Sequence, residues 1–156
     1  MQYFFYAISV NFLSWAIGEF VNSKINKQSW YRKFSELNFI KSERVRKLIG
    51  LDLFKKTLTT TVLNRFNPRL KLDQSKTTAD LKHLRAEMTN AEISHLIAFL
   101  LTLLSSLIVF YFNQLFGFLI FSLNIPMNLY PSLLQQKNKE RIDRLLLMAG
   151  KFSAKV

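Results

Sequence analysis

The sequence predicts an all-α integral membrane protein with three transmembrane helices and amphipathic helices at the membrane interface. Hydrophobic residues make up 49% of the 156 residues and cluster in long blocks. The 22 Lys and Arg outnumber the 10 Asp and Glu, giving a net charge of +12. No Lys or Arg lies before Lys24 or between Arg85 and Lys137. This segregation is typical of a membrane protein with basic loops and excludes a nucleic-acid partner. The length predicts a single membrane domain over residues 1–156.

The first predicted transmembrane helix covers residues 3–21. Nineteen residues rising about 1.5 Å each span roughly 28 Å, close to the hydrocarbon thickness of a bilayer. A cleaved signal peptide is the alternative interpretation. Against it, no basic residue precedes the apolar run and no A-x-A cleavage signal follows it.

The second and third predicted helices form a hairpin over residues 92–112 and 114–131, separated only by Asn113. Backbone polar groups in lipid must find partners within their own segment, so both spans are expected to be helical. Pro126 lacks a backbone N–H and is expected to kink the third helix near its end.

The two basic segments are residues 22–91, with 16 of the 22 cations, and residues 133–156, with the other six. The positive-inside rule predicts that both face the cytoplasm. The chain is therefore expected to be a multi-pass protein of the cell inner membrane with its N-terminus outside. The prediction is self-consistent, because a two-helix hairpin between these segments requires them to share a side.

Within the basic segments, alternating apolar and cationic residues predict further helices. Residues 28–57 are expected to form short amphipathic helices at the interface, broken near Gly50. Residues 66–77 are expected to be a turn-rich connection, and residues 78–91 a helix that continues into the second span. In the tail, Ile142, Leu145 and Leu146 are expected to form a stripe that faces lipid.

Ionisable groups near membrane depth are candidates for chemistry because their burial is costly. Glu92 and His95 are three residues apart and share one helical face, with Glu87 close by. A carboxylate beside an imidazole fixes its tautomer and raises its basicity, as a general base requires. The alternative is that Glu92 caps the helix N-terminus and His95 reaches the lipid headgroups.

The third helix places amides at the same level. In a hairpin centred on Asn113, Ala98 lies opposite Asn128. The height of Glu92 and His95 is therefore bracketed by four amides, Asn124, Asn128, Gln135 and Gln136. Such amides could bind a carbonyl oxygen or a sugar hydroxyl, or they could join helices to one another.

Cations follow directly on the third helix and its extension. Lys137, Lys139, Arg141 and Arg144 could hold the phosphate of an acyl-CoA or acyl-carrier donor. The alternative is that they contact anionic lipid headgroups.

Other chemistries find little support. One Glu-x-x-His unit and two His in total do not meet the needs of a di-iron bundle. The chain has no HExxH motif, no Gly-rich phosphate loop and no G-x-S-x-G motif. The absence of Cys excludes disulfides and thiol catalysis. We therefore expect neither a metal site nor a cofactor.

Three runs of residues resemble a known family. They are Glu87-x-x-x-Ala91-Glu92-x-x-His95, Asn124-x-Pro126, and Leu134-Gln135-x-x-Asn138-x-x-Arg141-x-x-Arg144-Leu145-Leu146. Over Glu87 to Leu146 the chain resembles the glycosyl-4,4'-diaponeurosporenoate acyltransferases, small membrane enzymes of carotenoid synthesis. It departs from them at Gln136, Lys137 and Lys139, where Arg, Tyr and Arg are usual.

The resemblance implies transfer of a fatty acyl group, from acyl-CoA or an acyl carrier, to a sugar hydroxyl of a glycosylated carotenoid or related glycolipid. It implies that His95 is the general base and that Glu92 or Glu87 orients it. The implied substrate-binding residues, for acceptor, carbonyl and donor phosphate, are Asn124, Asn128, Gln135, Asn138, Arg141 and Arg144.

Two other functions remain open on the sequence. The chain could be a non-catalytic small subunit of a membrane complex, with Glu92 and His95 contacting a helix of a partner membrane protein. A proton or ion pathway through Glu19, Glu92 and His95 is weaker, since the outer halves of the predicted spans lack ionisable groups.

Overall fold

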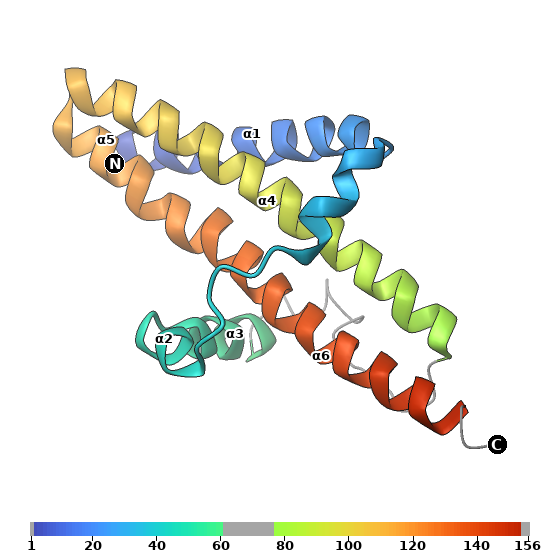
Figure 1. Cartoon of the computed structure of the whole chain (residues 1–156). Coiled ribbons are helices and arrows are strands. Elements are labelled where there is room, and N and C mark those ends of the chain that lie inside the picture. The colour runs from blue at the N-terminus through green and yellow to red at the C-terminus, as the bar shows by residue number, and fades with distance from the viewer. Residues whose placement is uncertain (1, 61–76, 154–156) are drawn as a thin grey trace.

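The computed structural model describes residues 2–60 and 77–153, and these residues form helices and no strand (Figure 1). The all-α fold class is confirmed. The elements are α1 (Gln2–Ile25), η1 (Ser29–Glu36), α2 (Glu43–Leu48), α3 (Leu51–Thr60), α4 (Thr78–Phe112), α5 (Gln114–Asn124), η4 (Ile125–Leu129) and α6 (Tyr130–Ser153). The connection predicted at 66–77 lies outside the described residues, except for residue 77.

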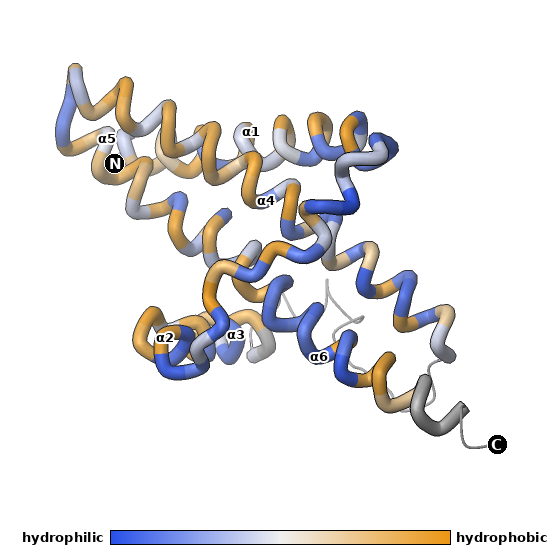
Figure 2. The backbone as a smooth tube through the Cα atoms, in the orientation of Figure 1, coloured by the Kyte–Doolittle hydropathy of each residue, from blue (hydrophilic) through white to orange (hydrophobic). Residues whose placement is uncertain are grey.

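Three helices are long and apolar enough to span a membrane: Gln2–Ile25, Thr78–Phe112 and Gln114–Ala149. Figure 2 shows hydrophobic residues concentrated on α1, on α5 and on the adjoining end of α4, whereas hydrophilic residues gather along α6. The second span and the residues that precede it form one continuous helix, α4. Its start is fixed by a capping box, in which the Thr77 hydroxyl accepts from Asp80 N (3.2 Å) and the Asp80 carboxylate accepts from Thr77 N (3.0 Å).

The tight turn between α4 and α5 lies at Asn113, as predicted. Its side-chain oxygen accepts a hydrogen bond from Phe116 N (3.0 Å) and so caps α5. The start of α1 lies at the same end of the molecule, because the rings of Tyr3 and Phe116 are 5.2 Å apart (Figure 1). The N-terminus and the hairpin turn therefore share one end.

The third helix is longer than predicted. At Pro126 the chain forms the π-helical segment η4, and the helix then continues as α6 to Ser153. Proline lacks the N–H that a regular turn would use, and a π-turn accommodates the change without ending the helix. The predicted tail is thus a continuation of the third span.

The stripe predicted to face lipid instead faces α4, and this expectation was wrong. Ile142 is fully buried against Leu81, Leu84 and Met88, and Leu145 and Leu146 pack around this cluster. The reason is the length of α4, whose first turns extend beside α6 and bury its apolar side chains.

The helices α1 and α4 approach each other through small and polar residues. A Cβ atom added to Gly18 would lie 2.5 Å from the Ser94 carbonyl oxygen and 3.1 Å from Ala98 N. Close approach through small side chains is a common way for membrane helices to associate. The buried residues of this type are Ala7, Asn11, Ser14, Gly18 and Asn22 on α1, and Ser94, Ala98, Thr102 and Ser106 on α4.

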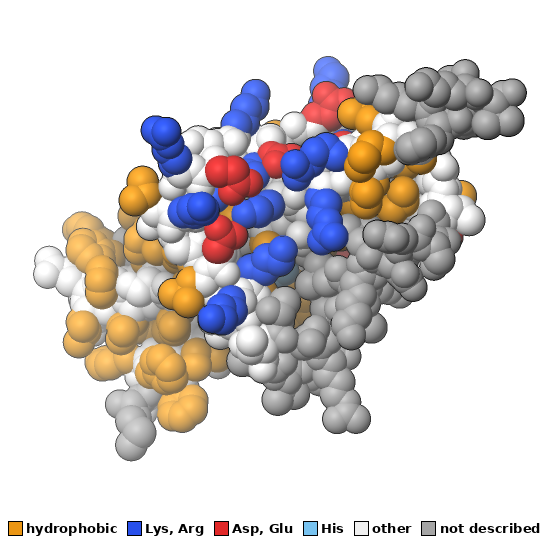
Figure 3. Space-filling view, turned by 90° about the horizontal axis from the view of Figure 1, so that it is seen from below, with side chains coloured by type: hydrophobic (Ala, Val, Ile, Leu, Met, Phe, Trp, Pro, Cys, Tyr) orange, Lys and Arg blue, Asp and Glu red, His pale blue; other side chains and the backbone are white. Residues whose placement is uncertain are grey.

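The short elements α2 and α3 cover part of α6. Leu51 of α3 is buried against Leu133 and Leu134. The break predicted near Gly50 lies between α2 and α3, where Gly50 has a φ of +75° that other residues rarely adopt. In Figure 3, Lys and Arg gather on part of one face with Asp and Glu between them, next to a hydrophobic region.

Candidate active site

His95 lies on α4 in a cavity between α1 and η4. The imidazole stacks on Trp15, with ring centroids 6.4 Å apart and an interplanar angle of 21°. We name this space, with a volume of about 170 Å³, the His95 cavity. Its lining residues are Asn11, Phe12, Trp15, His95, Met127 and Asn128. Phe12 and Trp15 are exposed on the outer side of α1, so the cavity opens toward the apolar surface of the molecule.

Asparagines from three elements meet beside this cavity. Asn128 Nδ2 donates to Asn124 Oδ1 (2.9 Å) and to Asn11 Oδ1 (3.2 Å). Asn124 Nδ2 in turn donates to the Phe99 carbonyl of α4 (3.0 Å). His95 and Asn128 interact through their side chains, and neither His95 Nδ1 nor Asn128 Oδ1 has another hydrogen-bond partner among the described residues. The cavity therefore places an imidazole and an amide side by side.

Glu92 is fully buried and faces α6. Its Oε1 accepts a hydrogen bond from Gln136 Nε2 (2.8 Å), and its Oε2 forms an ion pair with the Lys139 ammonium. Lys139 Nζ also donates to the Ser35 carbonyl (2.9 Å). Across the described chain no hydrogen bond joins Glu92 to His95. The capping alternative for Glu92 is wrong, because α4 begins at Thr78 and Glu92 lies in its interior.

The other carboxylates near His95 lie in different directions. Glu87 Oε1 is 3.8 Å from His83 Nδ1, on the part of α4 that leads away from the cavity. The carboxylate whose charge acts on His95 belongs to Glu19 of α1, one turn beyond Trp15. The structure thus gives each carboxylate its own surroundings instead of grouping Glu87 and Glu92 around the imidazole.

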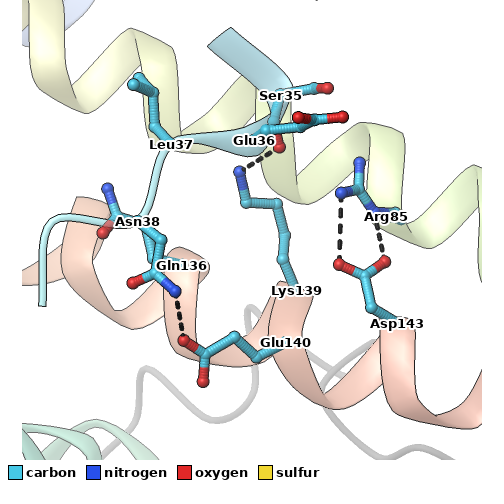
Figure 4. Close-up of a pocket in the computed structure, with 9 residues that line it drawn as sticks. All are labelled: Ser35, Glu36, Leu37, Asn38, Arg85, Gln136, Lys139, Glu140 and Asp143. Carbon is cyan, nitrogen blue, oxygen red and sulfur yellow. Dashed lines mark hydrogen bonds and ion pairs between the residues drawn. The ribbon is translucent and has the colours of Figure 1, made fainter. Parts of the chain in front are cut away.

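A second cavity, which we name the polar pocket, has a volume of about 290 Å³ and lies between η1, α4 and α6 (Figure 4). Arg85 binds Asp143 through two contacts, 2.5 Å from Nε to Oδ1 and 3.2 Å from Nη2 to Oδ2. Asn38 Nδ2 donates to Glu140 Oε1 (2.6 Å). The lining residues are Ser35, Glu36, Leu37, Asn38, Arg85, Gln136, Lys139, Glu140 and Asp143.

The segment after η1 is fastened to α6 by the buried Arg46. Its guanidinium binds both carboxylate oxygens of Glu140, with 2.8 Å from Nη1 to Oε2 and a shorter contact from Nη2, and its Nε donates to the Ile40 carbonyl (2.7 Å). The Glu140 carboxylate raises the pKa of Arg46 above its usual value. Nearby, Lys137 Nζ lies 2.9 Å from Asp52 Oδ1 and lowers the pKa of that carboxyl group. These bonds hold α2 and α3 against α6.

Tyr31 fastens η1 to two spanning helices. Its hydroxyl lies 2.9 Å from Asn22 Oδ1 of α1 and 3.0 Å from Asn90 Oδ1 of α4. Burial raises the pKa of the Tyr31 hydroxyl, so the group stays protonated and remains a hydrogen-bond donor.

The remaining predicted site residues lie along α6. Gln135 Oε1 and Asn138 Nδ2 are buried atoms without a hydrogen-bond partner in the described part of the chain. Arg141 and Arg144 are exposed, and Arg144 Nε donates to the Glu140 carbonyl (3.3 Å). The structure brings Asn124 and Asn128 to His95 and leaves the two arginines at the surface.

Asn11 and Trp15 were not predicted as site residues. Gln136 and Lys139 were predicted as polar groups near the substrate, and the structure makes them partners of Glu92. Two signals in the sequence point to Asn11 and to the partners of Glu92. Asn11 belongs to the small and polar stripe of α1. A hairpin centred on Asn113 also sets Glu92 opposite Leu134, within about a turn of Gln136 and Lys139, and a buried carboxylate needs a cation.

Among the described residues, no group of three or more His, Asp or Glu could hold a metal ion. A family model described as glycosyl-4,4'-diaponeurosporenoate acyltransferase matches residues 27–148. This range begins after α1 and contains η1, α2, Glu92 and His95. It also contains the residues of η4 and α6 that line the His95 cavity and the polar pocket. No curated protein and no solved structure matches the chain.

Proposed function

Because the chain belongs to the glycosyl-4,4'-diaponeurosporenoate acyltransferase family, we propose that it transfers a fatty acyl group to a hydroxyl of a glycosylated carotenoid or related glycolipid. The observation that carries the proposal is His95 in its cavity. The imidazole lies beside the buried amide of Asn128, with which it interacts, in a space that opens toward the apolar surface. Such a group can take a proton from a hydroxyl brought in by a lipid.

In the proposed reaction, the oxygen of the acceptor hydroxyl attacks the carbonyl carbon of a thioester donor, and His95 removes the proton of that hydroxyl at the same time. A C–O bond forms, the C–S bond breaks, and the proton passes from His95 to the departing sulfur. The Asn128 amide donates its two N–H groups to Asn124 and Asn11, so its Oδ1 is the atom that can accept a hydrogen bond from the acceptor hydroxyl or from the imidazole, and Asn124 orients it. Holding both lipids at one site is worth up to about 7–11 kcal/mol of the barrier.

Glu92 is proposed to act as a positioning residue. Its bonds to Gln136 and Lys139 join α4 to α6, and the helix carries His95 one turn further on. Glu92 thereby fixes the distance between the imidazole and the amides of the third span. Glu19 is the carboxylate that influences His95 through charge, whereas Glu87 lies beside His83.

We propose that the protein lies in the inner membrane with its N-terminus outside and its basic segments in the cytoplasm. His95 precedes Asn113 by 18 residues, or about 27 Å of helix. In a hydrocarbon layer of about 30 Å, this places the imidazole near the inner boundary. Arg141 and Arg144 then lie at headgroup depth or beyond, where a donor phosphate arrives.

Lipid mass spectrometry of cells with and without the gene tests this function. Deletion should remove an acylated glycolipid and cause its unacylated precursor to accumulate, and the wild-type gene should restore both. An unchanged lipid profile would contradict the proposal. Co-purification with another membrane protein at fixed stoichiometry would then favour a non-catalytic subunit.

A further inference from the structure

The buried amide of Asn128 has only one atom left to offer to the imidazole of His95. Its Nδ2 donates to Asn124 Oδ1 and to Asn11 Oδ1, so both of its N–H groups are used. Asn128 lines the His95 cavity, where the two side chains interact. The atom that Asn128 presents to the imidazole is therefore Oδ1, which can only accept a hydrogen bond.

Backbone carbonyl groups on three helices fix the direction of this amide. Asn124 Nδ2 donates to the Phe99 carbonyl of α4 (3.0 Å), so the oxygen of Asn124 is the end that faces Asn128. Asn11 Nδ2 donates in the same way to one backbone carbonyl of α1 (2.9 Å) and to one of α5 (3.4 Å). A carbonyl oxygen cannot donate, so turning any one of the three amides around would set oxygen against oxygen.

The imidazole must therefore donate to Asn128, and its Nδ1 is the nitrogen suited to do so. His95 Nδ1 and Asn128 Oδ1 are both buried, and neither has another hydrogen-bond partner in the described part of the chain. Buried polar atoms are rarely left unpaired, which favours a bond between these two atoms. A neutral imidazole carries one N–H, so a proton on Nδ1 leaves the lone pair of Nε2 free to act as a base.

The nearby carboxylates do not take this part. Glu92 faces α6, and Glu87 lies beside His83 on the part of α4 that leads away from the cavity. Glu19 is exposed on α1 and acts on the imidazole through its charge. The partner of the second ring nitrogen decides which nitrogen of a histidine is protonated. An amide can be that partner without burying a charge at membrane depth, where charge is costly.

We propose that Asn128, held by Asn11 and Asn124, is the positioning residue of the base: its Oδ1 accepts the Nδ1–H of His95 and so makes Nε2 the nitrogen that removes the acceptor proton. The inference rests on the proposed acyl transfer and names the reacting nitrogen and the residue that selects it. Asn11 lies before residues 27–148, which the family model matches. Helix α1 thus contributes to the chemistry of the site as well as to its packing.

Nitrogen NMR of the His95 ring tests the inference on the protein alone. His83→Gln leaves His95 as the single histidine of the chain. This parent chain, labelled with nitrogen-15 histidine, is measured in lipid nanodiscs at a pH where the imidazole is neutral. Nδ1 should carry the proton and Nε2 should not. Asn128→Leu should lose this preference, and its turnover should fall about tenfold or more, whereas Asn128→Asp keeps an acceptor oxygen and should retain the Nδ1–H.

The matched control is Asn22→Leu. Asn22 is a buried asparagine like Asn128 (2% and 1% exposed), but it binds Asn90 and Tyr31 and does not line the His95 cavity. Its loss should leave the protonated nitrogen of His95 unchanged.

A proton on Nε2 in the parent chain would overturn the inference, and this result needs no Asn128 variant to fold. The same tautomer in the parent chain and in Asn128→Leu would overturn it too, as would loss of the Nδ1–H in Asn22→Leu. The lipid profile of the deletion strain tests the acyl transfer separately, so failures of the two proposals are distinguishable.

Discussion

Replacing Lys139 by methionine removes one member of the buried ion pair that joins α6 to α4. The Lys139 side chain is 4% exposed and that of Glu92 is 0% exposed, so water cannot replace the lost partner. Breaking a buried pair on one side costs about 3–5 kcal/mol. For a chain of this size, each kcal/mol lowers the thermal midpoint by about 2–4 °C. We therefore expect Lys139→Met to lower it by roughly 6–20 °C.

The Glu92→Gln variant is expected to be milder, because glutamine can keep the bond to Gln136 and Lys139 keeps its bond to the Ser35 carbonyl. In the double variant, no uncompensated charge remains. It should therefore be more stable than the sum of the two single effects predicts, with a coupling of about 2–3 kcal/mol. Unfolding can be followed by the fluorescence of the two Trp residues in purified protein.

The control is Lys137→Met, two residues earlier on the same helix. Lys137 is 22% exposed and its partners Glu43 and Asp52 are about half exposed, so its loss should cost only about 0–1 kcal/mol. The reasoning on the buried pair is wrong if Lys139→Met lowers the thermal midpoint no more than Lys137→Met does. It is also wrong if the stability losses of the Glu92 and Lys139 variants simply add in the double variant.

Three further predictions concern the catalytic base, the helix contact and the orientation. His95→Ala should lower turnover about 100-fold or more with the thermal midpoint unchanged, and near-normal turnover in detergent would remove His95 as the base. Gly18→Val should destabilise the protein by about 1–3 kcal/mol, because even its Cβ would lie 2.5 Å from a backbone oxygen of α4; an unchanged midpoint would mean that α1 does not pack there. Since the chain has no Cys, single cysteines at Ser42 and Gln114 can be labelled from either side of the membrane, and they should react from opposite sides.

The three long helices could be predicted from sequence because hydrophobic length is a local property. The turn at Asn113 followed from the same patterns. The third helix was predicted to end at residue 131 with a kink at Pro126, but it continues as α6 to Ser153. A proline signals a missing hydrogen bond but does not reveal that a π-turn will absorb it. The stripe of Ile142 was misassigned for a related reason. An amphipathic pattern shows that a face is buried, but not whether lipid or another helix buries it.

The candidate site could be predicted only in part. The hairpin centre predicted that Asn124 and Asn128 lie at the height of His95, and Asn128 lines the His95 cavity. The spacing of Glu92 and His95 predicted one shared face of the helix. It did not show that Glu92 turns to Lys139 and Gln136 while His95 turns to Trp15. Which side chains of another helix a residue contacts depends on how the two helices rotate and cross. The helical period within one segment does not contain that information.

The acidic residues of the described chain bind cations that would otherwise repel one another around α6. Each of five carboxylates pairs with a cation on another element, and every one of these pairs includes a residue of α6 between positions 137 and 143. The carboxylates are those of Glu43, Asp52, Glu92, Glu140 and Asp143. Charges close to lipid must be neutralised because desolvation is costly. These pairs use four cations, Arg46, Arg85, Lys137 and Lys139. The positive excess therefore lies on other residues, such as the exposed Arg44 and Lys47, and is available to anionic headgroups. One set of cations thus holds the helices together around His95, and a different set is exposed on the surface.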